Sequence, residues 1–341
     1  MSWTETHFEK HVKERLTSEF GPDKGHSMYS RYVTARDKVL REIRQIPGVE
    51  PDLSDHGPDH LANVMDNAFS LIGGDTNVHG LSASDLYVLA LVIVFHDVGN
   101  LFGRADHHVN IGKVFDFARG NAADVRREKT LVIKAAQAHT GTSSAGSRNT
   151  LVAVDLADHL DNRPIQLRQI AAIMRFADEL AEGPQRTTDF YRAHIGYAAQ
   201  SEVYHQYAAC THVAADRANE RIRLTYEIQL DDFKGDPPEK KDSLATFLTF
   251  VFHRISKLDE ERRYAKFYCP ILAVFKQTDV VINFSKGGTL LPIDVRFQLD
   301  DLVIPGEHKA VLEVRFPGKC KTPANIAEDV YAVSEKGEEA R

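Results

Sequence analysis

The sequence predicts a mainly α-helical fold in which a helical bundle is followed by a smaller α+β domain. Apolar residues recur at helical spacing through the first half of the chain, and no long strand pattern appears before about residue 200. After that point the stretches 205–216 and 220–230 read as strands separated by a short polar turn at 217–219. The length of 341 residues fits two domains better than one of average size.

Turn and capping residues divide the first half into helices. Residues 1–50 are expected to be helical with a break near FGPDKG, and Gly73-Gly74 ends the helix that carries LANVMDNAFSLI. Ser82 offers an N-cap for the apolar helix that follows. Pro164 fits the first turn of the last helix, because that position needs no backbone N–H. The expected helices are residues 29–46, 61–72, 84–97, 107–119, 128–139 and 164–182.

The second half combines strands with a long polar loop and one helix. Residues 231–242 are expected to form the loop, and residues 243–261 the helix. Beyond about residue 320 the chain is polar and charged, as a mobile tail would be. Further strands are expected at residues 271–276, 279–285 and 292–299. The expected divisions are an N-terminal helical extension (1–50), a core domain (51–200), the α+β appendage (201–320) and the tail (321–341).

The composition disfavours several classes of protein. Hydrophobic residues make up 43% and charged residues 27%, an ordinary globular balance, and the formal net charge is −7. Because non-specific nucleic-acid binding needs a basic surface, we do not expect it here. Cys210, Cys269 and Cys320 lie far apart with no CxxC pair, which disfavours a thiolate zinc site and a disulfide framework.

Targeting and membrane signals are not apparent in the sequence. The N-terminus MSWTETHFEKHVKER has no apolar core of signal-peptide length. The longest apolar run, residues 86–95, is about half a membrane span and reads as a buried helix. We therefore expect a cytoplasmic protein without a membrane partner.

The pair His96-Asp97 directly follows that apolar run and is the strongest local feature. The 16 histidines are many for this length, and they cluster between residues 56 and 159. Neighbouring residues point about 100° apart on a helix, so both side chains reach one ion only at a helix end. Because a divalent metal accepts an imidazole nitrogen and a carboxylate oxygen together, the pair indicates a metal site.

Two further residues extend the pair to a pattern spread over three helices. His60 begins one helix 36 residues upstream, and Asp178 lies near the end of another in IMRFADELAEG. With this order, H…HD…D, the chain resembles the HD superfamily of metal-dependent phosphohydrolases over roughly residues 50–185. The resemblance implies an HD-domain helical bundle as the catalytic core. The metal ligands that it implies are His60, His96, Asp97 and Asp178.

The resemblance further implies one or two divalent ions, of Mn, Fe, Mg, Ni or Zn. Family members with two ions add two histidines between the pair and the last aspartate. His139 is one candidate, and either His107 or His108 is the other, with a slight preference for His108. The alternative is that these histidines donate hydrogen bonds to phosphate oxygens.

Several polar residues near the metal pattern are candidates for substrate contact and proton transfer. A guanidinium can hold a phosphate by two parallel hydrogen bonds, although Arg175 can instead form an ion pair with Asp178 or Glu179. The candidates for substrate binding are Arg104, Arg175, His107 and His56. A histidine or aspartate beside the metal would protonate the leaving oxygen. The candidate catalytic residues are Asp97, His139 and Asp106.

The implied activity is hydrolysis of a phosphate ester or phosphoanhydride bond of a nucleotide by a metal-activated water. The partner would be a small phosphorylated substrate, and the α+β appendage could complete the pocket, bind a regulator or form a homo-oligomer contact. The pair is followed by VGN and no GYP occurs, which disfavours the HD-GYP type of cyclic-di-GMP phosphodiesterase. The DHGxxH segment and the strand-rich second half look more like HD domains found with chaperone-type ATPases, and distantly like deoxynucleoside triphosphohydrolases.

Two other functions stay open at this point. Six ligands in the order H…HD…H…H…D also describe the mixed-valent di-iron oxygenases of the same fold, which need both added histidines. The second alternative is a regulatory or binding module with a vestigial metal site, and the complete set of ligands argues against it.

Overall fold

The chain divides into two compact units, one built from helices and one that combines helices with a mixed sheet. Unit 1 contains Met1–Ala181 and Tyr264–Ala273, and unit 2 contains Glu182–Arg263 and Val274–Arg341. The predicted fold class, mainly α with a smaller α+β part, is therefore confirmed. The computed structural model describes residues 3–51, 53–76, 80–104, 107–140, 146–188, 192, 194–301 and 322–339.

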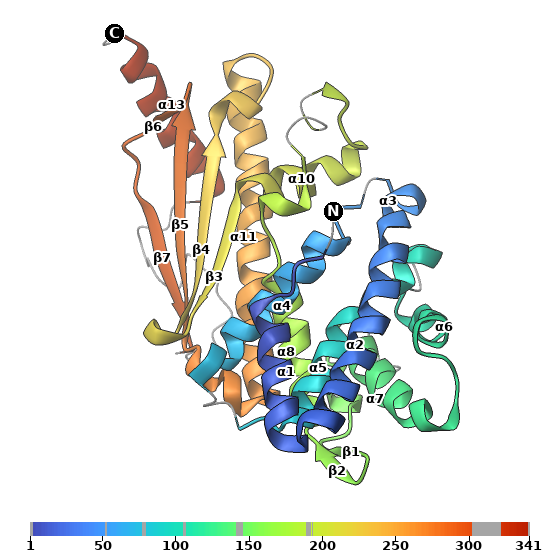
Figure 1. Ribbon diagram of the computed structural model, residues 1–341. Helices are drawn as coiled ribbons and strands as arrows, with labels where there is room; N and C mark the ends of the chain where they lie inside the picture. The colour runs from blue at the N-terminus through green and yellow to red at the C-terminus, as the bar shows by residue number, and fades with distance from the viewer. Residues whose placement is uncertain are drawn as a thin grey trace. The chain divides into compact units, whose positions relative to one another are not determined.

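Unit 1 contains every helix that the first half of the sequence predicts (Figure 1). Gly21, at φ +80°, separates the first two helices, and Gly73 adopts a left-handed conformation at the end of the third long one. Ser82 caps the apolar helix and forms a capping box with Asp85. The helices are α1 (His7–Phe20), α2 (Pro22–Glu42), α3 (Ile46–Val49), α4 (Pro58–Ile72), α5 (Ala83–Phe95), α6 (His107–Arg119), α7 (Arg126–Gln137) and α8 (Leu167–Glu179), with the 3-10 helix η3 (Val98–Phe102) between α5 and α6.

Helix α5 forms the centre of unit 1. All of its residues from Ala83 to Phe95 are buried, and it contacts α1, α2, α7 and α8. The segment Ala83–Phe102 is long and apolar enough to cross a membrane, but 89% of its most apolar window is buried within the protein. The apolar run therefore serves as a core helix, and its end carries the His96-Asp97 pair to the middle of the bundle.

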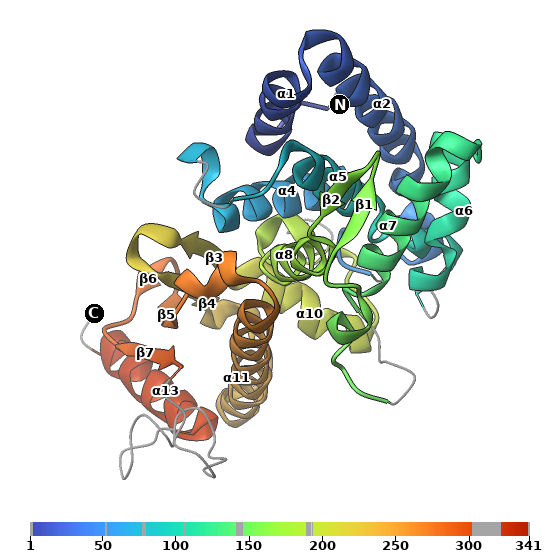
Figure 2. The ribbon, with the colours of Figure 1, turned by 90° about the horizontal axis from the view of Figure 1, so that it is seen from below.

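One short hairpin lies between α7 and α8, so α8 begins at Leu167 and not at Pro164 as expected. Pro164 lies in strand β2 (Arg163–Ile165), which pairs with β1 (Asp158–Leu160), and not in the first turn of a helix. Asp161 and Asn162 form the two-residue turn at φ +49° and +60°, a conformation that these two residue types tolerate well. The hairpin contacts α5 and α7 (Figure 2).

Unit 2 is organised around a five-stranded mixed sheet. Antiparallel pairs lie on both sides of one parallel pair, β4 with β5, and the long helix α11 connects these two strands. The helix packs on the sheet through Phe252, whose ring lies 5.8 Å from that of Phe297. The elements are α10 (Ala199–Cys210), β3 (Thr211–Asp216), β4 (Arg221–Gln229), α11 (Pro237–Tyr268), β5 (Gln277–Lys286), β6 (Thr289–Leu290), β7 (Val295–Asp300) and α13 (Pro323–Glu339).

Four expectations for the second half are wrong in detail. Residues 205–210 end helix α10 and only 211–216 form a strand, the part that pairs with β4. Helix α11 begins at Pro237 inside the expected loop, where proline suits a first turn. Most of the expected strand 271–276 is a 3-10 helix, Pro270–Val274. The expected mobile tail contains α13, whose Ile326, Ala327 and Val330 are buried.

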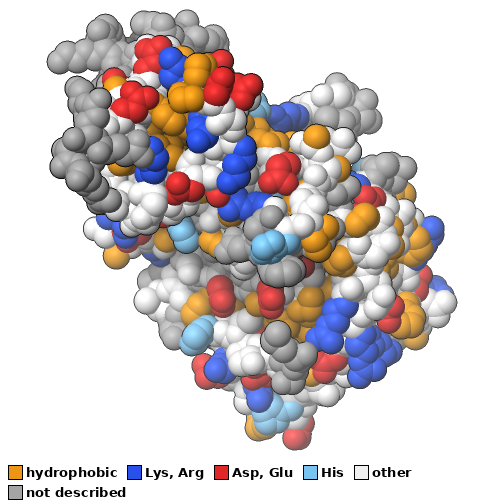
Figure 3. Space-filling model, turned by 90° about the horizontal axis from the view of Figure 1, so that it is seen from above, with side chains coloured by type: hydrophobic (Ala, Val, Ile, Leu, Met, Phe, Trp, Pro, Cys, Tyr) orange, Lys and Arg blue, Asp and Glu red, His pale blue; other side chains and the backbone are white. Residues whose placement is uncertain are grey.

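Charged side chains of both signs are mixed on the face drawn in Figure 3, where Lys and Arg lie beside Asp and Glu. A typical exposed pair is Lys134 with Asp155 in unit 1, at 2.6 Å. Such pairs contribute little to stability because water and salt screen them. The fold therefore depends on the buried apolar side chains of each unit.

Candidate metal centre

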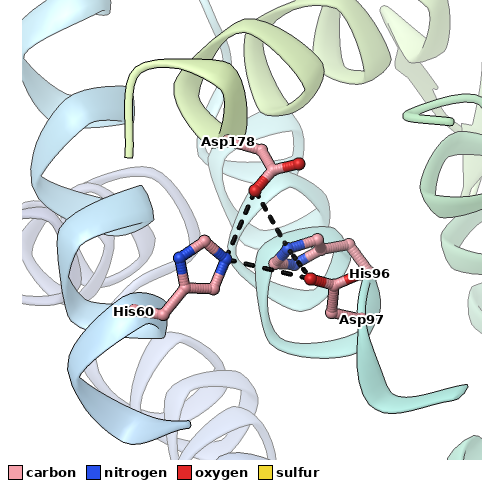
Figure 4. A group of neighbouring side chains, drawn as sticks. All are labelled: His60, His96, Asp97 and Asp178. Atoms are coloured by element: carbon pink, nitrogen blue, oxygen red, sulfur yellow. Dashed lines mark ion pairs between the residues drawn. The ribbon is translucent and has the colours of Figure 1, made fainter. Parts of the chain in front are cut away.

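Three helices of unit 1 bring four side chains to one place (Figure 4). His60 lies in the first turn of α4, His96 and Asp97 follow the last residue of α5, and Asp178 lies in the last turn of α8. His60 Nε2 is 3.3 Å from Asp178 Oδ1 and 3.8 Å from Asp97 Oδ2. His96 Nε2 is 3.3 Å from Asp97 Oδ2 and 3.6 Å from Asp178 Oδ1. The structure therefore brings together the four residues that were predicted from the sequence to be metal ligands.

The end of α5 explains how adjacent residues face one point. His96 keeps helical backbone angles, whereas Asp97 leaves the helix at φ −108° and ψ 2°. This change of backbone direction lets the carboxylate turn toward its neighbouring imidazole rather than point about 100° away. This geometry agrees with the prediction that His96 and Asp97 can reach one ion because they lie at the end of a helix.

A second group shares Asp97 with the first. His107, at the start of α6, and His139, just after α7, lie with Nε2 at 3.7 and 3.3 Å from Asp97 Oδ1. The other carboxylate oxygen, Oδ2, faces His60 and His96. All three members of the second group lie within 4.8 Å of one another by their ligand atoms. Asp97 is therefore placed to bridge two positions, one on each side of its carboxylate.

The preference for His108 over His107 is wrong. His107 is buried and belongs to the second group, whereas His108 is half-buried and is not a member of it. Neighbouring residues diverge on a helix, so only one of the two can face Asp97. A Cβ at Gly99 would lie 1.6 Å from the carbonyl oxygen of His107, so glycine is needed for η3 to approach the start of α6 this closely.

Three of the histidines, His96, His107 and His139, direct Nε2 to the centre because their Nδ1 is bonded to the backbone. Nδ1 of His96 bonds to the carbonyl of Ile93 at 2.7 Å, and Nδ1 of His107 bonds to that of Arg104 at 2.9 Å. His139 Nδ1 makes the same contact with a carbonyl three residues earlier, at 2.5 Å. A carbonyl accepts only from a protonated nitrogen, so in the neutral form of each ring Nε2 carries the lone pair that a metal needs.

The donor atoms fit a divalent cation. Among the described residues, Nε2 of His60, His96 and His107 and Oδ1 of Asp97 are buried without a hydrogen-bond partner. Buried polar atoms without partners are costly, and a cation would satisfy all of them at once. Two ligands about 2.1 Å from a tetrahedral ion are about 3.4 Å apart. The observed separations of 3.3–3.8 Å are close to that value.

The buried carboxylates and imidazoles shift one another's pKa. Burial opposes the charged form of His96, but the carboxylates of Asp97 and Asp178 outweigh it and raise the pKa of His96 well above its usual range. Burial likewise opposes ionisation of both carboxyls, yet the neighbouring imidazoles hold the pKa of Asp97 and of Asp178 well below the usual range. Burial lowers the pKa of His107 to about 4, against a smaller opposing effect of Asp97. His107 and the two carboxylates are thus already in metal-binding form at neutral pH.

His56 also faces the centre. It is buried, its Nδ1 contacts the carbonyl of Ser54 at 2.5 Å, and its Nε2 lies 3.6 Å from Asp97 Oδ2. A small cavity is lined by this ring together with His60, His96 and Asp97. The structure therefore brings His56, predicted as a substrate contact, to the edge of the metal ligands.

The remaining predicted residues lie around the centre or outside the described part of the chain. Arg104 is exposed, and its Nη1 donates to Asn100 Oδ1 at 3.3 Å. Arg175 is buried, and its Nη1 donates to the carbonyl of Ala138 at 3.2 Å and to Thr150 Oγ1 at 2.8 Å. Asp106 lies outside the described residues.

Two residues of the VGN segment that follows His96-Asp97 contribute to the site and were not predicted to do so. Gly99 permits the approach of α6, as described above. Asn100 is fully buried, and its amide nitrogen has no hydrogen-bond partner among the described residues. Their place directly after His96-Asp97 was the available signal.

Comparison with known families gives one match. The family model HD-CE matches residues 50–236, which are more than half of the 341 residues and include all the members of both histidine–aspartate groups. Neither the curated proteins nor the solved structures contain a significant match to the chain. The matched region and the buried cluster agree with the resemblance found in the sequence, and the chain therefore belongs to the HD-CE family of the HD superfamily.

Proposed function

We propose that this protein is a metal-dependent phosphohydrolase that cleaves a phosphate ester or phosphoanhydride bond of a nucleotide. The observation that carries the proposal is the carboxylate of Asp97, which lies between two groups of buried imidazoles and faces each with one oxygen. Such a shared carboxylate is typical of centres that hold two divalent ions about 3.5–4 Å apart. HD-superfamily membership favours phosphoryl chemistry at such a centre.

The two groups define which residues would hold each ion. The first position would be held by His60, His96, Asp97 and Asp178, and the second by Asp97, His107 and His139. A divalent cation bound there supplies positive charge for a phosphoryl oxygen and lowers the pKa of a coordinated water toward 7.

The protein's own contribution is to orient the ligands and the phosphate. Backbone carbonyls fix the rings of His96, His107 and His139 before substrate arrives, so little reorganisation is needed at the centre. His56 lies beside the shared carboxylate, where a ring could contact a phosphoryl oxygen. Arg104 is exposed near η3 and carries a guanidinium able to hold a phosphate by two hydrogen bonds.

The test is a panel of nucleoside mono-, di- and triphosphates and dinucleotides, each supplied with Mn²⁺, Mg²⁺, Co²⁺, Ni²⁺ or Zn²⁺. We expect release of phosphate or of a shorter nucleotide that depends on the ion and disappears in Asp97→Asn. Asp116→Asn, which alters an aspartate paired with Lys129 away from the centre, serves as the matched control. Equal turnover by Asp97→Asn and wild-type protein would contradict the proposal.

A di-iron oxygenase is the second candidate, because this function requires two added histidines and two lie beside Asp97. His107 and His139 both join the shared aspartate, which completes the order H…HD…H…H…D. Purified protein that holds two irons and consumes oxygen with an added organic substrate would favour this candidate. A protein that binds metal and shows neither activity would favour a regulatory module.

A further inference from the structure

The residue before His139 is held by side chains that are not part of either histidine–aspartate group. The carbonyl oxygen of Ala138 accepts a hydrogen bond from Thr150 Oγ1 at 2.6 Å and another from Arg175 Nη1 at 3.2 Å. Arg175 Nη1 also donates to Thr150 Oγ1 at 2.8 Å. Ala138 is the C-cap of α7, where carbonyls lack a partner within the helix. These bonds fix the peptide group that connects Ala138 to His139.

A tyrosine near the end of α11 supports this arrangement. The guanidinium carbon of Arg175 lies 4.7 Å from the centre of the Tyr264 ring, within the range of a cation–π contact. The Tyr264 hydroxyl donates to Asn149 Oδ1 at 2.8 Å and accepts from the N–H of Leu151 at 2.9 Å. Tyr264 begins the segment Tyr264–Ala273, which belongs to unit 1 although it lies beyond the region that the family model matches.

We propose that Arg175 and Tyr264 are positioning residues for His139 and thereby set the affinity of the second cation position. This inference rests on the proposed metal centre and extends it to residues that touch no ligand atom. Two constraints act on His139, one through the bond of its Nδ1 to the carbonyl of Ala136 and one through the peptide group that Arg175 holds. Together they keep Nε2 at 3.3 Å from Asp97 Oδ1.

The first cation position does not include His139, the residue whose peptide group Arg175 holds. Arg175 lies on α8, as Asp178 does, but its side chain contacts Ala138, Thr150 and Tyr264, and His139 follows α7. Residues that orient a metal ligand through a hydrogen bond typically change metal affinity by about 10–100-fold when they are replaced. Loss of the Arg175 contacts is therefore expected to weaken one of the two positions and to spare the other.

The experiment titrates the full chain with Mn²⁺ and follows the free ion by electron paramagnetic resonance. Wild-type protein is expected to bind two ions in separate steps. Arg175→Met is expected to bind the second ion about 10–100-fold more weakly and the first with unchanged affinity. Arg175→Lys keeps a cation and N–H donors, so it should recover part of the lost affinity.

Arg168 provides a matched control on the same helix. It lies two turns before Arg175, its guanidinium carbon is 5.7 Å from the centre of the Tyr268 ring, and its Nε donates to the carbonyl of Val154 at 2.7 Å. Arg168→Met should therefore loosen the same loop without releasing Ala138, and its Mn²⁺ titration should match that of the wild type. Tyr264→Phe removes only a hydroxyl, and it should weaken the second ion less than Arg175→Met does. It replaces Arg175→Met in the test if that variant does not fold.

Three results would overturn the positioning role. They are an unchanged second affinity in both Arg175→Met and Tyr264→Phe, an equal loss in Arg168→Met, and a wild-type chain that binds a single ion. The proposed activity can be refuted while the positioning role still holds. Two-step Mn²⁺ binding that depends on Arg175, without hydrolysis of any nucleotide, would contradict the activity and support the positioning role.

Discussion

Replacing Asp97 by asparagine tests whether the cluster is a metal centre or a buried network of ion pairs. The substitution keeps the size of the side chain and removes the charge that both histidine groups face. At a cation concentration about 100 times Kd, each bound ion should stabilise wild-type protein by about 2.7 kcal/mol over chelator-treated protein. For a unit of this size that gain raises Tm by about 5–11 °C. Asp97→Asn is expected to lose most of the increase, because it weakens both cation positions.

With a chelator present, the same substitution should change stability little, because two Coulomb energies oppose each other. The ligand atoms of Asp97 and Asp178 lie within 4.8 Å, so their charges repel by about 3.5 kcal/mol at an effective dielectric constant of about 20. Asp97 and protonated His96, 3.3 Å apart, attract by about 5 kcal/mol on the same scale. The two energies therefore largely offset each other, and the expected net cost of the substitution is small, about 1–2 kcal/mol.

The assay is thermal and urea unfolding of wild-type, Asp97→Asn and Asp116→Asn proteins, each with Mn²⁺ and with a chelator. The control should show the full wild-type increase in Tm. Breaking a structural buried ion pair typically costs about 3–5 kcal/mol whatever the metal content. A loss of that size in the chelator, with no effect of Mn²⁺ on the wild type, would refute the reasoning and identify the cluster as structural.

Four further predictions follow from named contacts. Gly99→Ala should cost about 1–3 kcal/mol and weaken the second ion, because its Cβ would lie 1.6 Å from the carbonyl oxygen of His107; Mn²⁺ titration and urea unfolding check this. In chelator-treated protein the pKa of His107 is about 4, below its ordinary 6.5, so its contribution to stability is full above pH 6.5 and is lost as pH falls toward 4. Urea unfolding between pH 4 and 6.5 should show that the free energy of unfolding depends less steeply on pH in His107→Gln than in the wild type. An equal dependence in both would contradict the lowered pKa of His107. Because nearby carboxylates raise the pKa of His96, metal binding should release a proton, which calorimetry in buffers of different ionisation enthalpy measures; equal heats in those buffers would count against it. Ser82→Ala should cost about 1 kcal/mol through loss of the α5 cap and leave the Mn²⁺-dependent rise in Tm intact, as thermal unfolding with and without Mn²⁺ would show.

The sequence was sufficient for the helices of unit 1, apart from the start of α8, and for the four residues of the first histidine–aspartate group, because both depend on local pattern. The apolar run that becomes α5 ends at His96-Asp97, and a helix end is the one place where such neighbours can share an ion. His60 and Asp178 could be added because the order of the motif is itself specific. The structure then placed all four within reach of one another.

Contacts between distant residues could not be predicted in this way. Choosing His107 over His108 depends on how α6 approaches Gly99, which periodicity does not encode. Pro164 suits the first turn of a helix as well as a hairpin strand, and pairing with residues 158–160 decided between them. Tyr264 is separated from Arg175 by 89 residues, so only the folded chain shows that they touch.

Helix α5 has no solvent-facing side, and this has a consequence for metal uptake. A helix whose residues are all buried cannot open without disrupting the packing of its neighbours, so its backbone amides should be among the slowest in the protein to exchange with deuterium. His96 and Asp97 are attached to the end of this slowly exchanging element. The two side chains are thus held in register in the folded chain, so a cation that binds there would meet ligands already in place and would not have to order them.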